Sequence, residues 1–145
     1  MVSVTKSTVV PFSAEQMYDL VNDIEAYPSF LSWCEAARVL NRGQDRLTAS
    51  LSLSVGRIKQ SFTTENSMQP GRRIDLQLLS GPFKYLNGHW QFDPHSDHSC
   101  CISVQMDFEF RNKLLKLALD KVFSHIIMTL IDSFTHRAQQ LYGRQ

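Results

Sequence analysis

The chain has 145 residues, of which 43% are hydrophobic, and its 15 Lys and Arg nearly balance 14 Asp and Glu, for a formal net charge of +1. This length and composition predict a single domain over residues 1–145, and the near-neutral charge gives no general electrostatic reason to expect DNA as a partner. No apolar run approaches the roughly 20 residues of a membrane-spanning helix, and an odd number of cysteines does not predict a disulfide framework.

The first elements are expected to be a strand and two short helices. Residues 2–10 are rich in Val and Thr, which favour a strand. Ser13 is placed to cap a short helix, with Gln16 three residues later as its capping-box partner. Asp23 is placed to cap a second short helix, which Pro28 is expected to end.

Six strands are expected next, because apolar and polar residues alternate between short turns that contain Gly, Pro or Asn. The polar stretch 93–99 is interpreted as a turn. Short turns join consecutive strands into an antiparallel meander. The expected strands cover residues 34–40, 47–55, 58–65, 74–78, 86–92 and 101–111.

One long helix follows the last strand. From Asn112 onward the apolar residues recur at helical spacing over roughly 30 residues, from Leu115 to Leu141. A sheet with one apolar face followed by one long apolar helix predicts that the helix lies across the sheet. The predicted fold class is therefore α+β, with a curved antiparallel sheet of about seven strands wrapped around a C-terminal helix.

No metal centre or catalytic thiol is expected. His95 and His98 lie in a polar stretch that is best explained as a solvated loop, and no cysteine pair has the spacing of a structural zinc site. Cys34 lies in an apolar segment where burial keeps a thiol inert, and Cys100 and Cys101 would point to opposite faces of a strand. Phosphate-binding glycine loops and the Gly-x-Ser-x-Gly motif are absent from the sequence.

The predicted inward face of the sheet carries few groups that could transfer a proton. Its polar exceptions are Gln60, Thr64 and Tyr85, whereas the carboxylates of the same strands alternate outward. Such an interior suits holding a ligand better than converting it, so the protein is not expected to be an enzyme and no catalytic residue is assigned. A polyketide cyclase or aromatase is the weaker alternative.

Three segments carry a resemblance to a known family. YPSFLSWC at 27–34 resembles the motif YPxFLPWC, with Ser32 in place of the usual Pro; GPFKYL and WQF within 81–92 resemble GPFxxLxxxWxF; and FTHRA at 134–138 resembles FxxRA. These motifs occur in the family that joins bacterial ribosome-association toxins to mitochondrial coenzyme Q-binding proteins, within the START and Bet v 1-like (SRPBCC) superfamily. The resemblance extends over residues 2–143 and implies the helix-grip fold.

The resemblance implies a dry cavity that binds a hydrophobic ligand, most simply a ubiquinone-type isoprenoid lipid, in support of respiration. The lipid would be a bound ligand, and no cofactor is expected. Periodicity alone favours a solid packed core made of the same residues, and it is the resemblance that favours a cavity. The candidate ligand-binding residues are Phe30, Leu31, Trp33, Phe62, Leu76, Leu78, Phe83, Leu86, Trp90, Met106, Phe108, Phe123, Ile127, Leu130 and Phe134.

The toxin relatives suggest an alternative function, which is binding to the large ribosomal subunit and blocking the joining of the two subunits. Clustered cations would meet ribosomal RNA phosphates, whereas a mixed solvated surface would not. The resemblance and the lack of a transit peptide favour a bacterial cytoplasmic protein. The candidate rRNA-binding residues are Arg57, Lys59, Arg72, Arg73 and Lys84, with Lys113, Lys116 and Lys121 as further members of a possible basic face.

Overall fold

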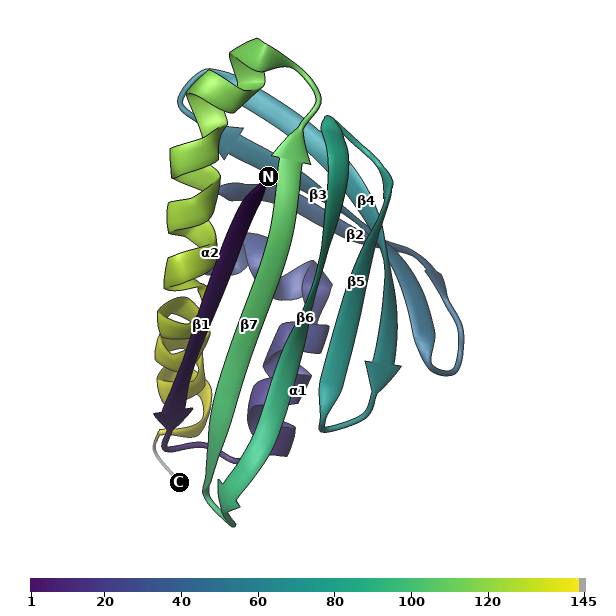
Figure 1. Cartoon of the computed structure of the whole chain (residues 1–145). Coiled ribbons are helices and arrows are strands. Elements are labelled where there is room, and N and C mark those ends of the chain that lie inside the picture. The colour runs from purple at the N-terminus through teal and green to yellow at the C-terminus, as the bar shows by residue number, and fades with distance from the viewer. Residues whose placement is uncertain (144–145) are drawn as a thin grey trace.

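The computed structural model describes residues 1–143, so the last two residues of the predicted domain lie outside the described range. Over these residues, seven strands form one antiparallel sheet in the order β1-β7-β6-β5-β4-β3-β2, and the sheet curves around helix α2 (Figure 1). The predicted helix-grip arrangement is confirmed. The elements are β1 (Val2–Val10), α1 (Ala14–Asn22), the 3-10 helix η1 (Ile24–Ser29), β2 (Cys34–Arg42), β3 (Arg46–Val55), β4 (Ile58–Gln69), β5 (Arg73–Ser80), β6 (Phe83–Ser96), β7 (Ser99–Phe110) and α2 (Lys113–Tyr142).

The sheet is a meander from β2 to β7, and β1 pairs with the last strand of that meander. Strand β7 shows the expected alternation most clearly, since every second residue from Cys100 to Phe110 is buried against the helices. Strand β1 is antiparallel to it, with Val4 opposite Met106. This pairing places the first and the last strand of the sequence side by side at one edge of the sheet, where α2 packs.

The two short helices differ from the prediction in detail. The capping box of α1 is present, because the Gln16 amide donates to Ser13 Oγ at 3.1 Å and the Ser13 amide donates to Gln16 Oε1 at 3.0 Å. The prediction that Asp23 caps the next helix is wrong, since its side chain makes no capping hydrogen bond. Pro28 lies inside η1 and does not end it, because a single 3-10 turn tolerates one missing amide donor.

The prediction of a polar turn over 93–99 is also wrong. Strand β6 extends to Ser96 and β7 begins at Ser99, so only Asp97 and His98 form the turn between them. Backbone pairing does not require apolar side chains. Here the hairpin projects beyond the helices, so the polar residues of β6 are exposed and the alternation that marks a half-buried strand is lost.

Helix α2 begins where the period changes, as predicted. The side chain of Asn112 accepts a hydrogen bond from the Leu114 amide at 2.7 Å and caps its first turn. The helix packs against β1, β7 and α1. Within residues 1–143, none of the helices combines the length and the hydropathy that crossing a bilayer requires. The buried face of α2 consists of Leu119, Phe123, Ile126, Ile127, Leu130, Ile131, Phe134 and Ala138.

A cluster of five phenylalanines fills the space between sheet and helix near the beginning of α2. We call it the phenylalanine cluster, and its rings meet mostly edge to face, the geometry that aromatic pairs prefer. The Phe83 and Phe110 rings stack with centroids 4.6 Å apart, and those of Phe108 and Phe123 lie 4.8 Å apart. The cluster consists of Phe62, Phe83, Phe108, Phe110 and Phe123.

Candidate ligand-binding site

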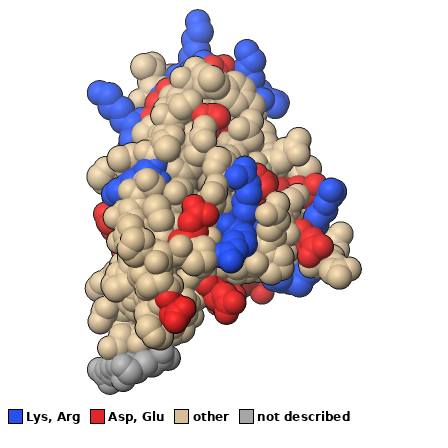
Figure 2. Space-filling view, turned by 60° about the horizontal axis from the view of Figure 1, so that its bottom comes forward, with Lys and Arg blue, Asp and Glu red and all other residues tan. Residues whose placement is uncertain are grey.

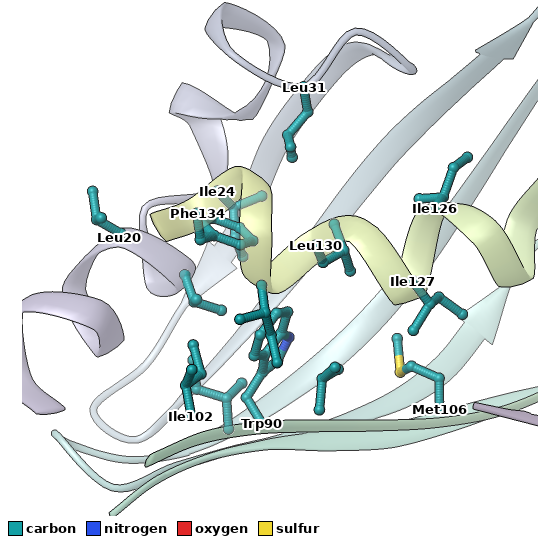
Figure 3. Close-up of a cluster of buried hydrophobic side chains, with 14 of the residues drawn as sticks. Leu20, Ile24, Leu31, Trp90, Ile102, Met106, Ile126, Ile127, Leu130 and Phe134 are labelled. Atoms are coloured by element: carbon teal, nitrogen blue, oxygen red, sulfur yellow. The ribbon is translucent and has the colours of Figure 1, made fainter. Parts of the chain in front are cut away.

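A cavity of about 80 Å³ lies beside the phenylalanine cluster, between α2 and the concave face of the sheet. A single water molecule needs about 10–15 Å³ measured in the same way, so this space is several times larger than one water molecule requires. Ile127 of α2 points toward Met106 of β7, and Phe134 of α2 lies beside Trp90 of β6 (Figure 3). The walls consist of Val21, Ile24, Tyr27, Trp33, Ala49, Leu51, Phe62, Thr64, Asn66, Ile74, Leu76, Leu86, Trp90, Met106, Phe123, Ile126, Ile127, Leu130 and Phe134.

Most of the predicted ligand-binding residues line this cavity. They come from the segment before β2, from the inward faces of strands β4 to β7 and from the buried face of α2. That they bind a ligand stays a prediction, but the fold does bring them to one place. They are Trp33, Phe62, Leu76, Leu86, Trp90, Met106, Phe123, Ile127, Leu130 and Phe134.

Five predicted residues do not line the cavity. Phe83 and Phe108 belong to the phenylalanine cluster. Phe30 packs on Phe134 with ring centroids 5.4 Å apart, and the Arg137 guanidinium lies 5.4 Å above its ring. Leu31 is buried and Leu78 half-buried, both away from the walls. Alternation indicates which side chains point inward, but it does not indicate which inward side chains border empty space.

The prediction missed several wall residues for identifiable reasons. Ile24 and Tyr27 belong to η1, whose apolar side chains were not assigned to the interior. Ile126 was recognised as part of the apolar helix face but was not named as a ligand contact. Asn66 was missed because the strand was ended at residue 65. The alternation of Phe62, Thr64, Asn66 and Met68 continues beyond that point and would have found it.

Thr64 and Asn66 form the polar part of an otherwise apolar wall. They are 9% and 5% exposed, and the Thr64 hydroxyl donates to Asn66 Oδ1 at 2.8 Å. The strand partners of Asn66 are Leu47 on β3 and Leu76 on β5. Neither side chain can accept a hydrogen bond. The predicted inward position of Thr64 is therefore confirmed, whereas Gln60 and Tyr85 are half-buried and lie away from the walls.

A glycine on β6 makes room for the Met106 side chain of the cavity wall. Gly88 occupies an inward position of β6 between Leu76 and Met106. A Cβ at this position would come within 2.1 Å of the Gln105 carbonyl oxygen and 2.3 Å of Met106 Sδ. The Met106 side chain therefore lies over the glycine. Because Met has three rotatable bonds and adapts its shape easily, this part of the wall is its most deformable.

The cavity walls carry no charged side chain within residues 1–143. Tyr27 is a wall residue with an ionisable side chain, and burial raises the pKa of its hydroxyl far above the ordinary value. Its hydroxyl donates to the Val21 carbonyl oxygen. A phenol that stays protonated and is already hydrogen-bonded does not exchange protons near neutral pH.

The thiols and histidines lie away from the cavity. Burial raises the pKa of both the Cys34 and the Cys100 thiol to about 11, so the expected burial of Cys34 is confirmed, and its inertness stays a prediction. Cys101 is half-buried on the other face of β7. His95 and His98 are exposed at the β6–β7 hairpin. In the part of the chain that the structure describes, His, Cys, Asp and Glu do not gather into a group of three or more that could hold a metal ion.

The five predicted rRNA-binding cations do not lie together. Arg57 precedes the 12-residue strand β4 and Arg72 follows it, so the two lie roughly 40 Å apart at 3.3 Å per residue. Lys59 pairs with Glu35 at 3.0 Å, and Arg73 pairs with Asp75 at 3.0 Å. On the face drawn in Figure 2, positive and negative side chains are interspersed.

Lys84 belongs to a different group of cations. Both Lys84 and Lys116 lie within 4 Å of Glu109, at 3.7 Å and 3.5 Å, and the ammonium group of Met1 lies 3.2 Å from the same carboxylate. The hydrogen bond from that ammonium group, with the charges of Lys116 and Lys84, lowers the pKa of Glu109. Arg111 joins them, since its guanidinium donates to the Phe83 carbonyl oxygen at 3.4 Å. We call Lys84, Arg111 and Lys116 the basic cluster.

Comparison with known proteins places these features in context. The model of the family described as "Polyketide cyclase / dehydrase and lipid transport" matches residues 10–135. The chain is 41% identical over 143 residues to a protein named "Ribosome association toxin RatA" from Vibrio cholerae, covering 99% of each chain. It is 28% identical to "Coenzyme Q-binding protein COQ10 homolog B, mitochondrial" from Xenopus laevis, covering 97% of this chain and 59% of that one.

Solved structures show the same fold. A START superfamily protein from Mycobacterium smegmatis superposes with a TM-score of 0.82 at 22% identity, covering 96% of this chain and 98% of that one. The Zhui aromatase/cyclase from Streptomyces superposes with a TM-score of 0.85 at 16% identity, covering 96% and 94%. At these identities the likeness concerns the fold alone, because one fold hosts many unrelated activities.

Proposed function

The chain belongs to the polyketide cyclase / dehydrase and lipid transport family, and on that premise we propose that it binds a neutral hydrophobic ligand of the ubiquinone type without converting it, in support of respiration. The observation that carries the proposal is the uncharged cavity under α2. The name of the coenzyme Q-binding relative supports the choice of ligand. We further propose a bacterial cytoplasmic location, which the bacterial relatives support.

Apolar walls favour such a ligand energetically. Each methylene group that leaves water contributes about 0.8 kcal/mol, so an isoprenoid tail binds without polar contacts. A space of about 80 Å³ is too small for a quinone ring with its tail. Entry therefore requires the wall to move, and the Met106 side chain over Gly88 is the place where the wall gives way most easily.

The walls also argue against the cyclase alternative. General acid–base catalysis needs a group whose pKa lies near the working pH. The hydroxyl of Thr64 and the amide of Asn66 do not titrate in that range, and Tyr27 stays protonated. We therefore infer that the protein is not an enzyme. Turnover of a polyketide substrate that disappears in Thr64→Val would overturn this inference.

Gentle purification followed by native mass spectrometry tests the proposed ligand binding. Wild-type protein from quinone-producing cells should carry a neutral lipid adduct that organic extraction identifies as a quinone. Ala49→Leu places a larger side chain on the cavity wall and should lose the adduct, whereas Ala36→Leu, an exposed change on β2, should keep it. Repeated absence of any adduct on the wild-type protein would contradict the proposal.

Association with the ribosome is the second candidate function. It is favoured by 41% identity, over almost the whole of both chains, to proteins named ribosome association toxins. The basic cluster offers a surface, because Lys84 and Lys116 lie within 4 Å of one carboxylate, Glu109, and Arg111 donates to the carbonyl oxygen of Phe83, the residue before Lys84. Phosphate groups of RNA reward such point charges regardless of sequence.

Sedimentation with salt-washed large ribosomal subunits tests this candidate. Reversing the basic cluster with Lys84→Glu, Arg111→Glu and Lys116→Glu should abolish cosedimentation. The matched control is Arg57→Glu with Arg72→Glu and Arg73→Glu, which reverses three cations outside the basic cluster and changes the net charge by the same amount. Equal loss in both variants would point to net charge alone, and unchanged binding of the basic-cluster variant would remove that cluster as the ribosome-binding surface.

A further inference from the structure

Two hydrogen-bonded polar residues, Thr64 and Asn66, lie in the cavity wall. Asn66 is 5% exposed and lines the cavity, yet its position serves no evident structural purpose. Its Oδ1 accepts from Thr64, which leaves the Nδ2 amide group with two N–H donors. Within residues 1–143, no side-chain hydrogen bond from that nitrogen is formed.

The surroundings of Asn66 explain why its donors have no protein partner. Leu47 and Leu76 flank it on the neighbouring strands, and Gly88 has no side chain in the same inward row. An amide donor left without a protein partner in an apolar wall is unfavourable. A leucine or valine at position 66 would have no unpaired donor, as Leu47 and Leu76 have none at the neighbouring positions. The amide group of Asn66 in an otherwise apolar wall is therefore explained by a ligand atom that accepts a hydrogen bond from it.

The chemistry of the wall restricts what that ligand atom can be. The wall carries no cation within the described chain, so a carboxylate or phosphate group would be buried without a counter-charge, which is strongly unfavourable. A ligand ammonium group would likewise find no carboxylate. An uncharged carbonyl oxygen is the acceptor that fits an amide donor, and the apolar remainder of the ligand fits the other walls.

We propose that Asn66 Nδ2, oriented by the Thr64 hydroxyl, donates a hydrogen bond to a carbonyl oxygen of the bound ligand. The ligand class is thus a neutral apolar molecule with a carbonyl group, such as a quinone or an acyl ester, and not a plain hydrocarbon or a free fatty acid. This assignment rests on the proposed ligand binding and deepens it. Thr64 is a positioning residue, because its hydrogen bond holds the amide with Nδ2 free for the ligand.

Two probes of equal chain length test the assignment, namely a decyl-substituted benzoquinone and decylbenzene, which lacks the carbonyl groups. Binding is measured by the shift in melting temperature and by quenching of the fluorescence of Trp33 and Trp90, which both line the cavity. Wild-type protein should bind the quinone about tenfold or more tightly than the hydrocarbon, as expected for one buried hydrogen bond. Asn66→Leu should abolish this preference and leave hydrocarbon binding nearly unchanged.

Further variants separate recognition from folding. Asn66→Asp keeps the size of the side chain but replaces the donor with oxygen, so it should also abolish the preference for the quinone. Thr64→Val should weaken the preference in part. Asn87→Leu, an exposed change on β6, should alter neither affinity.

The outcomes distinguish this assignment from the proposed function itself. If wild-type protein binds both probes equally, or if Asn66→Leu and Asn66→Asp weaken both equally, carbonyl recognition by Asn66 is overturned while ligand binding stands. If neither probe binds to the wild-type protein, the proposed ligand binding fails first. Loss of quinone preference in both Asn66 variants, with hydrocarbon binding retained, supports the assignment.

Discussion

The space between α2 and the sheet contains two regions that differ in packing. Near the beginning of α2 the phenylalanine cluster packs densely, and Phe83, Phe108 and Phe110 are fully buried. Further along the helix the same sheet face leaves a cavity, which Phe62 and Phe123 of the cluster border. Side-chain size contributes to the difference, because the packed region has phenylalanines on facing strands whereas the cavity wall includes Ala49.

The comparison teaches that one curved sheet serves two purposes. The packed region supplies stability through dispersion contacts and buried area. The hollow region forgoes part of that stability, and its walls are thereby free to accept a ligand. Substitutions in the two regions should consequently have different effects on folding and on ligand binding.

Truncation of a large side chain gives the largest expected difference. Phe83→Ala removes a ring that contacts four other phenylalanines and should lower the free energy of unfolding by about 3–5 kcal/mol. Leu130→Ala, on the cavity wall, should cost less, about 2–3 kcal/mol, because Leu130 already borders empty space. Urea denaturation measures both values. A larger loss for Leu130→Ala would show that the cavity is filled or collapsed in solution.

Enlargement of a small side chain gives an effect of intermediate size, and its sign depends on whether the side chain borders the cavity. Ala138→Leu places three additional carbon atoms into a fully buried position away from the cavity and should destabilise the protein by about 1–3 kcal/mol. Ala49→Leu places the same atoms next to empty space and should be neutral or stabilising by about 0.5–2 kcal/mol.

Thermal unfolding of this matched pair, without ligand, provides the measurement. Ala49→Leu should also lose the stabilisation that an added quinone gives to the wild-type protein, since a ligand that binds the native state alone raises its stability. Equal destabilisation by both substitutions would mean that Ala49 faces a packed environment.

Alkaline pH tests the two buried thiols. Burial raises the pKa of Cys34 and of Cys100 from 9.0 to about 11, so between these values the unfolded chain releases protons that the folded chain keeps. The unfolded state then binds fewer protons, and the free energy of unfolding falls as the pH rises from about 9 to about 11. Below pH 9 the two thiols make no difference to the pH dependence.

Single Cys34→Ala and Cys100→Ala variants divide this effect between the two thiols. Cys34 follows Trp33 of the cavity wall, whereas Cys100 is the second residue of β7, at the opposite end of that strand from Phe108 and Phe110. Each variant should reduce the alkaline fall by a similar amount in denaturation curves at pH 8, 9, 10 and 11. A much smaller contribution from Cys34 would indicate that water from the cavity reaches it.

The sequence predicted the architecture well, because the spacing of its apolar residues distinguishes strands from helices unambiguously. The alternation from 101 to 111 and the helical spacing that follows correspond to β7 and α2 almost residue for residue. The capping box of Ser13 and Gln16 was equally readable. Prediction failed at the β6–β7 hairpin and at η1, where the structure depends on backbone pairing and short-range contacts that leave no periodic pattern.

The candidate site was predictable only in part. Period 2 and period 3.6 indicate which side chains point inward, and that was enough to select Trp90, Met106 and Phe134. It was not enough to exclude Phe83 and Phe108, because an inward ring in the phenylalanine cluster and an inward ring on a cavity wall have the same pattern. The predicted rRNA-binding residues show the same limit, since Arg57 and Arg72 lie at opposite ends of one strand.

The sequence by itself determined the order of elements, the apolar faces that join them and the family to which the chain belongs. These are properties of local spacing and composition. Only the tertiary structure decided where the interior is solid and where it is hollow, which polar side chains border the hollow part, and which cations meet around Glu109. Those features depend on how residues from distant strands face one another, because packing density and charge clustering arise from side chains that are neighbours only after the sheet has curved around the helix.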